Sequence, residues 1–191
     1  MSYQNKVIII SGASGSGKTT LVNYLLQYKE LNLTFSVSAT TRKKRKHEIN
    51  GEHYNFLSIM DFKNKIQSND FLEWEEVYRN HFYGTLRSSA MHILNTGKNI
   101  LFDVDVKGAQ SIKNHFKDDS LSIFIQAPSI DIAVERLKKR KTESVNTMEL
   151  RVKKIKQEIK LGKTMDVQLI NDNLDVIKLQ IYNLINQFLE L

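Results

Sequence analysis

The chain has 191 residues, a length that suits one core domain with small insertions. Its residues are 41% hydrophobic, and no apolar run approaches the ~18 residues that a membrane span needs. It has no cysteine, which excludes a disulfide framework and a thiolate metal site. Because the first residues lack the pattern of a signal peptide, we expect a cytoplasmic protein that has no membrane partner.

Basic side chains exceed acidic ones by seven, and they are unevenly distributed. Residues 42–46 are all basic, and residues 136–163 contain 11 basic and three acidic side chains. Such segments bind either nucleic acid or small phosphorylated ligands. Since no strand combines aromatic and basic residues as single-strand binders do, the sequence favours phosphorylated ligands over nucleic acid.

The chain begins as strand, loop and helix. An apolar run predicts a strand near residues 6–11, and apolar periodicity predicts a helix from Lys18 to about Glu30. Between them, residues 12–19 read GASGSGKT and match the phosphate-loop pattern G-x-x-x-x-G-K-[ST]. In this pattern, backbone N–H groups surround phosphate oxygens, the lysine reaches the β- and γ-phosphates, and the last hydroxyl can bind Mg²⁺. The motif predicts binding of a nucleoside triphosphate.

A strand-rich segment follows the first helix. Residues 35–39 alternate as a strand does, residues 54–57 and 72–77 look like short strands, and apolar spacing indicates a short helix near residues 62–66. A basic loop that ends in the turn signal Asn50-Gly51 follows the first of these strands. This segment is a candidate substrate-binding subdomain.

Helices and strands alternate regularly after residue 86. Strands are expected over residues 99–105, 121–126 and 167–170, and helices near residues 87–96, 108–116, 129–140 and 147–162 and at the C-terminus. The pattern predicts an α/β fold with a phosphate-loop NTPase core, in which helices flank a parallel five-stranded sheet. A small strand-rich insertion and a helical lid complete the expected architecture.

Two acidic residues lie at the end of the strand expected over residues 99–105. Asp103 ends the apolar run, and ligands of open α/β sheets bind at that edge. Asp105 would point to the opposite face of a regular strand. We expect at least one of the two to contact substrate or metal-bound water, the alternative being a cap of the next helix.

Two further groups could recognise a substrate. Arg42 and Arg45 could bind a phosphate together with the hydroxyl of Tyr54, or they belong to a solvated basic loop. Glu73 lies among bulky apolar residues. Its carboxylate could accept the adjacent N1–H and N2–H₂ groups of guanine, which adenine lacks, or it could simply face water.

These signals together make the chain resemble guanylate kinase over nearly its whole length. The matching stretches are GASGSGKTT, FSVSATTR, NGEHYNFLS, FLEWEEV, FYGT, ILFDVD and INDNLD. The phosphate loop is shared widely, whereas the order and spacing of the other motifs are specific. The resemblance implies a cytoplasmic enzyme of purine metabolism that transfers the γ-phosphoryl group of ATP to GMP, with Mg²⁺ as cofactor and dGMP as a further expected acceptor.

The resemblance also implies roles for individual residues. The implied ATP-binding residues are Gly12, Ala13, Ser14, Gly15, Ser16, Gly17, Lys18, Thr19, Thr20 and Asn171, with Thr19 as the Mg²⁺ ligand. The implied GMP-binding residues are Ser38, Arg42, Arg45, Tyr54, Glu73, Tyr83, Thr85, Asp103 and Asp105. The implied catalytic residues are Lys18, Asp103, Arg140 and Arg151. The implied domains are a core (1–34, 88–128 and 164–191), a GMP-binding subdomain (35–87) and a lid (129–163).

One departure from the family falls in the basic loop. The family usually has prolines and a glycine after the TTR motif, where this chain reads Lys43-Lys44-Arg45-Lys46-His47, so the rigid positioning of Arg45 is in question. Two alternatives stay open at this point: a related kinase that acts on ribose bisphosphate and a non-catalytic guanylate-kinase-like binding module. The expected state is a monomer or a homodimer that binds ATP and GMP and no nucleic acid.

Overall fold

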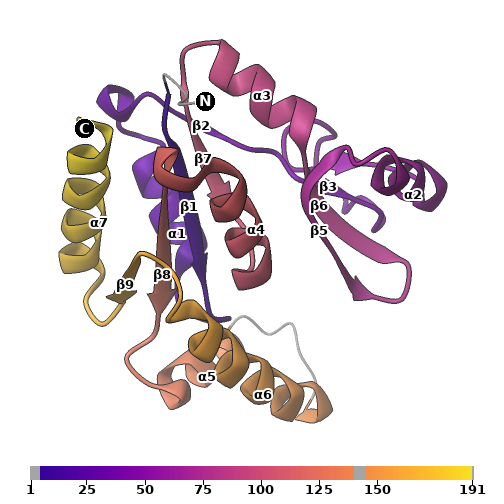
Figure 1. Ribbon diagram of the computed structural model, residues 1–191. Helices are drawn as coiled ribbons and strands as arrows, with labels where there is room; N and C mark the ends of the chain where they lie inside the picture. The colour runs from indigo at the N-terminus through magenta and orange to yellow at the C-terminus, as the bar shows by residue number, and fades with distance from the viewer. Residues whose placement is uncertain (1–4, 140–144, 191) are drawn as a thin grey trace.

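A parallel sheet forms the centre of the molecule (Figure 1). The computed structural model describes residues 5–139 and 145–190, apart from the side chains of residues 78, 139 and 145–150. Within them, the five-stranded sheet has the order β2-β7-β1-β8-β9, and each neighbouring pair is parallel. Its strands are β1 (Val7–Gly12), β2 (Leu33–Phe35), β7 (Asn99–Asp103), β8 (Ser120–Gln126) and β9 (Val167–Ile170). The predicted α/β core is confirmed.

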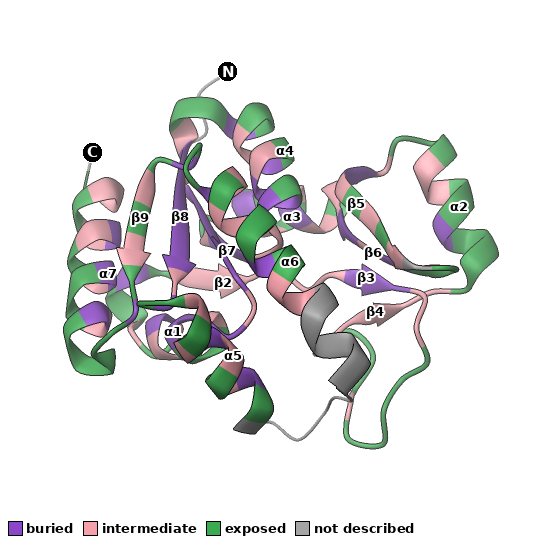
Figure 2. Cartoon of the chain, turned by 90° about the horizontal axis from the view of Figure 1, so that it is seen from below, coloured by how far each residue is buried: buried purple, intermediate pink, exposed green. Residues whose placement is uncertain are grey.

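Helices cover both faces of this sheet, as a parallel sheet requires (Figure 2). Successive side chains of β1 point to opposite faces. Ile8 and Ile10 pack with α1 and α7, whereas Val7 and Ile9 pack with α3, α4, α5 and α6. No helix in the described part of the chain is both long and apolar enough to cross a membrane. The helices are α1 (Lys18–Leu25), α2 (Ile59–Gln67), α3 (Arg87–Asn95), α4 (Val106–Phe116), α5 (Ile130–Lys139), α6 (Val145–Gly162) and α7 (Leu174–Leu189).

The strand-rich insertion, which follows α1 and precedes α3 in the sequence, forms a second, smaller sheet to one side of the main sheet (Figure 1). Its order is β4-β3-β6-β5, built from β3 (Ala39–Thr40), β4 (Asn55–Phe56), β5 (Phe71–Tyr78) and β6 (His81–Leu86). Phe62 of α2 stacks on Phe71 and Phe82, with ring centroids 4.3 and 5.4 Å away, and these rings form a separate small core. The sequence pattern had not predicted β6 as a strand of its own.

The first helix is shorter than predicted. It ends at Leu25 instead of Glu30, because the N–H groups of Gln27 and Tyr28 bond to carbonyls only three residues back. Such bonds tighten the last turn and end the α-helical pattern. A 3₁₀ helix over Lys29–Leu31 then leads the chain toward β2.

Two further boundaries differ from the prediction. Residues 35–39 do not form one strand, because the end of β2 lies in the main sheet and β3 begins the small sheet at Ala39. The strand expected over residues 99–105 ends at Asp103, and α4 begins before Gly108. Its start is earlier because the Asp105 carboxylate caps it, accepting a hydrogen bond from the N–H of Gly108 at 2.7 Å.

Candidate active site

The phosphate loop joins β1 to α1 in a conformation that glycine permits. Gly15 and Gly17 have φ angles of 82° and 90°, in the left-handed region. A side chain at Gly12 would overlap the carbonyl oxygen of Ile125. The loop ends at the N-terminus of α1, where backbone N–H groups and the helix dipole favour an anion.

Lys18 and Asp103 lie at the carboxyl edge of the main sheet. The ammonium of Lys18 donates to the carbonyl oxygen of Gly12 at 2.6 Å. Asp103 ends β7, beside Ile10 of β1. Burial raises the pKa of Asp103, and the nearby charge of Lys18 opposes that rise. Thr19, the next residue of α1, is exposed and its hydroxyl is accessible to a ligand.

Glu73 and Thr85 form a polar pair between β5 and β6. The two residues are register partners, and the Thr85 hydroxyl donates to Glu73 Oε1 at 2.6 Å. Gly108 leaves room for this carboxylate, since a Cβ there would lie 2.9 Å from Glu73 Oε2. Burial raises the pKa of Glu73 to about 7, the negative charge of Asp105 adds to the rise, and the Thr85 hydroxyl opposes it. The interpretation of Glu73 as a solvated residue is therefore wrong.

Arg42, which follows β3, lies against the aromatic rings of Tyr54 and Phe56. Its guanidinium lies 4.9 Å from the ring centroid of Tyr54, and the rings of Tyr54 and Tyr83 are 6.0 Å apart. Glu48 pairs with the guanidinium and also accepts from the backbone N–H of Arg45 at 2.8 Å. The bond with Arg42 lowers the pKa of Glu48 to about 2. Arg45 is exposed, and Glu48 links its backbone to the guanidinium of Arg42.

One cavity of about 330 Å³ brings most of the predicted substrate residues together. It reaches from the phosphate loop, through the ends of β1 and β7, to the small sheet. The predicted residues that line it are Gly12, Lys18, Ser38, Tyr54, Glu73, Tyr83, Asp103 and Asp105. Arg42, Arg45 and Thr85 are not among the lining residues, although Thr85 reaches the cavity through its bond to Glu73.

A second cavity, of about 140 Å³, lies over the phosphate loop. Residues 13–19 line it together with Leu137 of α5 and Arg151 of α6. Arg151 is therefore near the loop, as predicted. The other predicted lid arginine, Arg140, lies outside the described residues. Thr20 is in α1 and is exposed.

Asn171 packs directly against the phosphate loop. Its Nδ2 donates to the carbonyl oxygen of Ser16 at 2.7 Å, and a Cβ at Gly17 would overlap its amide group. Asn171 is only 5% exposed, and its backbone N–H bonds to Gln126 at the end of β8. Asn171 thus holds the phosphate loop against the end of β8. A contact between Asn171 and the ATP base stays a prediction.

Replacing Asn171 with alanine is expected to lower the free energy of unfolding by about 1–3 kcal/mol, because the buried Ser16 carbonyl loses its partner. Urea unfolding measures the change. Asn64→Ala on the exposed face of α2 is the control and should change stability by less than about 0.5 kcal/mol. Equal midpoints for Asn171→Ala and the wild type would contradict a structural role for this amide.

Sequence reasoning missed three acidic residues at the site. Besides Glu48, these are Glu75, which lines the large cavity, and Glu158 of α6, which accepts from the N–H of Ser14 at 3.1 Å. All three belong to segments rich in charge. Charged side chains in such segments are usually solvated, so composition carries no signal for them.

Comparisons with known proteins identify the family of the chain. The guanylate kinase family model matches residues 4–188. A guanylate kinase of Porphyromonas gingivalis is 48% identical over 184 residues, which cover 96% of this chain and 98% of the relative. A guanylate kinase of Bartonella henselae is 40% identical over 169 residues, covering 88% of this chain and 75% of the relative. The crystal structure of guanylate kinase from Anaplasma phagocytophilum has a TM-score of 0.76 and 26% identity, covering 99% of this chain and 88% of that one.

A phosphate loop at the edge of a parallel sheet, with a cavity that reaches from it to a small second sheet, is typical of a phosphate-loop kinase. The sequence comparisons then specify which one. The chain belongs to the guanylate kinase family, and its function is that of a guanylate kinase enzyme. The resemblance inferred from the sequence is confirmed, and the ribose bisphosphate kinase and the non-catalytic module are not favoured.

Proposed function

We propose that the chain transfers the γ-phosphoryl group of ATP to GMP, and also to dGMP, releasing ADP and GDP or dGDP. One observation carries the proposal: Lys18 of the phosphate loop and Glu73 of the small sheet line the same cavity. A donor phosphate and an acceptor nucleotide could therefore meet in one cavity. Chromatographic detection of GDP from ATP and GMP tests the proposal, and absence of GDP would reject it.

The acceptor site would recognise GMP at two ends. Ser38, Glu73 and Thr85 would hold guanine, because an ionised carboxylate beside two hydroxyls matches the N–H groups of this base. Arg42, Arg45, Tyr54 and Tyr83 would hold the phosphate. Arg42 must then exchange its pairing with Glu48 for the phosphate, or share the guanidinium between them. Asp103 and Asp105 would lie between the two ends, close to the ribose and the metal-bound water.

The donor site would hold ATP with Mg²⁺. No group of three or more potential ligand side chains lies together among the residues that the structure describes, so the nucleotide must supply most of the metal's ligands. Thr19 would contribute its hydroxyl, and the triphosphate would contribute oxygens; such hard ligands suit Mg²⁺. When bound, Mg²⁺ supplies positive charge to the phosphates. Gly12 to Thr20 would surround them, and Asn171 would support the loop and contact the ATP base.

Catalysis would depend on positioning and positive charge. The transition state of phosphoryl transfer is loose and spreads negative charge over three oxygens. Lys18, Arg140 and Arg151 would stabilise that charge, and Asp103 would help to order the reacting groups. Because a GMP phosphate oxygen is already an anion, no strong general base is needed. Closure over both substrates would exclude water and suppress hydrolysis of ATP.

The wider assignments follow from the same reading. Residues 1–34, 88–128 and 164–191 would form the core, residues 35–87 the GMP-binding subdomain and residues 129–163 the lid. We place the reaction in purine metabolism in the cytoplasm. The partners are small nucleotides, not nucleic acid, because lysines of the basic lid line the active-site cavities. A monomer suffices for this site, and a homodimer is compatible with it.

The pH dependence of GMP use provides a further prediction. Because the pKa of Glu73 is raised to about 7, its carboxyl is mostly protonated at pH 6 and mostly ionised at pH 8. Only the ionised form accepts from both guanine N–H groups, so kcat/KM for GMP should rise through this interval. Steady-state assays from pH 5.5 to 8.5 measure the profile.

Two variants show which carboxyl group causes the rise in kcat/KM with pH. The pKa of Glu75 is also about 7, so Glu75→Gln is the control and should keep the rise. Glu73→Gln should lose most of it and retain the titration of the GMP phosphate, near pH 6, with a smaller contribution from Glu75. Loss of the rise in Glu75→Gln and its persistence in Glu73→Gln would transfer the titration to Glu75.

A further inference from the structure

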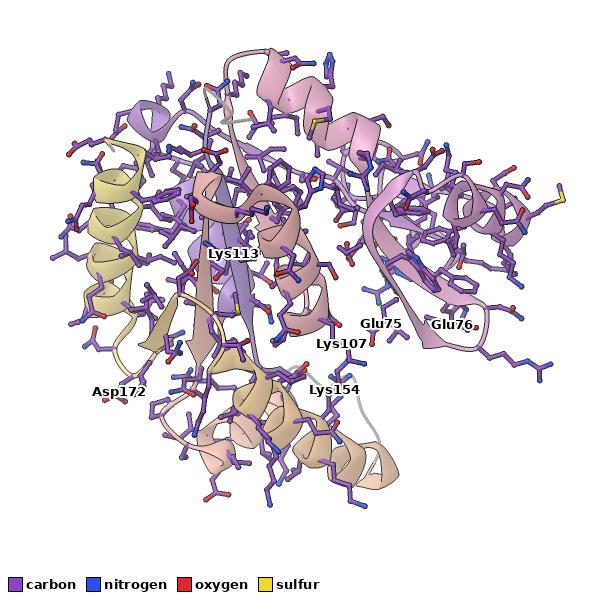
Figure 3. The ribbon with its side chains drawn as sticks, viewed as in Figure 1. Glu75, Glu76, Lys107, Lys113, Lys154 and Asp172 are labelled. Carbon is purple, nitrogen blue, oxygen red and sulfur yellow. The ribbon has the colours of Figure 1, made fainter. Side chains whose placement is uncertain are left out.

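Charged residues from three elements meet beside the active-site cavity (Figure 3). Glu75 comes from β5 of the small sheet, Lys107 from the first turn of α4, and Lys154 from α6. With Asp105 they line a cavity of about 400 Å³. Glu75 and Lys154 also line the neighbouring cavity of about 330 Å³ that contains most of the predicted substrate residues. The junction therefore joins the small sheet, the core and the lid.

Glu75 faces the same side of β5 as Glu73, since only Trp74 separates them and side chains two positions apart share a face of a strand. It is partly buried and bonds to the carboxyl of Asp105. That bond, burial and the charge of Asp105 raise the pKa of Glu75 to about 7, while the charges of Lys154 and Lys107 oppose the rise. Lys107 and Lys154 are thus the positive charges that face the Glu75 carboxyl in this cavity.

Helix α6 connects this junction to the phosphate loop. Arg151, Lys154 and Glu158 recur at spacings of three and four residues, so they share one face of the helix. Arg151 lines the cavity over the loop, and Glu158 bonds to the N–H of Ser14. Ile155, four residues after Arg151 on the same side of the helix, is fully buried in the main core. A pull on Lys154 would therefore move a rigid helix that also carries Arg151.

We propose that Glu75 and Lys154 are positioning residues that pair across the cleft when both nucleotides are bound, drawing α6 onto the small sheet and setting Arg151 over the phosphates. The inference rests on the proposed function, because Asp105 is a predicted GMP contact. When GMP binds, Asp105 would contact the nucleotide and no longer Glu75. The Glu75 carboxylate would then be free to pair with Lys154. Lys107, from the core, would only partly oppose the rise in the Glu75 pKa while the lid is open.

A charge-reversal cycle tests the pair. Lys154→Glu and Glu75→Lys are each expected to lower kcat/KM for GMP about tenfold, since like charges then face each other as the cleft closes. The double variant restores an opposite pair and should return to within about threefold of the wild type. Lys156→Glu and Glu76→Lys make the same charge changes away from the cavities and should remain near the wild-type value.

A distance measurement separates positioning from a merely structural effect. The chain has no cysteine, so Asn64→Cys on α2 and Lys160→Cys on α6 give two unique labelling sites, both exposed. GMP with a non-hydrolysable ATP analogue should shorten the label distance in the wild type and the double reversal, and less in either single reversal. Additive losses in the cycle, or equal shortening in all variants, would overturn the inference. Failure of the wild type to phosphorylate GMP would instead reject the proposed function.

Discussion

Replacing Glu73 with glutamine is expected to lower kcat/KM for GMP by about 10³-fold. A site built to bond a polar edge rejects a mismatch strongly, because buried groups are left unpaired. The glutamine keeps one acceptor but presents its amide N–H₂ to a guanine N–H group, and donor then faces donor. Coupled assays with GMP measure the loss, and KM for ATP should change little because the donor site lies at the phosphate loop.

Stability distinguishes this effect from damage to the fold. The pKa of Glu73 is raised from 4.5 to about 7 on folding, so its stabilising contribution is present below pH 4.5 and lost as pH rises through about 7. At pH 8 the neutral glutamine should therefore leave Tm equal or higher. Glu76→Gln, at an exposed position of the same strand, is the matched control. Wild-type turnover of GMP by Glu73→Gln would refute the guanine assignment.

Replacing Lys18 with alanine is expected to lower kcat by about 10³-fold or more. The ammonium is the charge of the phosphate loop that can follow the transferring phosphoryl group, and preorganised charge is usually the largest contribution to such catalysis. Its bond to the Gly12 carbonyl is the contact that ATP would displace. Single-turnover assays with saturating ATP and GMP measure the chemical step.

The fold should survive this change. Lys18 begins α1 and is only partly buried, and alanine is the best helix former. The variant should therefore melt within a few degrees of the wild type. Lys29→Ala, at an exposed lysine beyond α1, should keep full activity. Normal turnover by Lys18→Ala with an unchanged melting curve would mean that the loop does not carry the chemistry.

Much of the core could be predicted because local and global signals coincide there. The run over residues 7–10 is buried on both faces and reads as continuous apolar sequence. The β9 strand was predicted at its observed bounds, and the buried stripe of α7 follows the expected period. The predictions failed where the structure is less regular. The end of α1 depends on hydrogen bonds to carbonyls three residues back, and β6 is recognisable as a strand only from its pairing with β5.

Sequence motifs named individual residues of the candidate site, and their roles stay predictions. The structure brings Lys18, Glu73 and Tyr83 together around one cavity of about 330 Å³. The arrangement around Arg42 could not be predicted, because pairing with Glu48 depends on how an irregular loop folds back. Likewise, Glu75 reaches the cavity only through the register of β5, and adjacent carboxylates in sequence give no sign of which one faces inward.

The most direct measurement is an ADP-release assay with ATP and Mg²⁺ that compares GMP, dGMP, AMP, CMP, UMP and ribose 1,5-bisphosphate as acceptors. The account predicts turnover with GMP and dGMP far above the other acceptors, because only guanine offers two adjacent N–H groups to Glu73. Turnover with ribose 1,5-bisphosphate alone, or with none of these acceptors despite ATP binding, would contradict it.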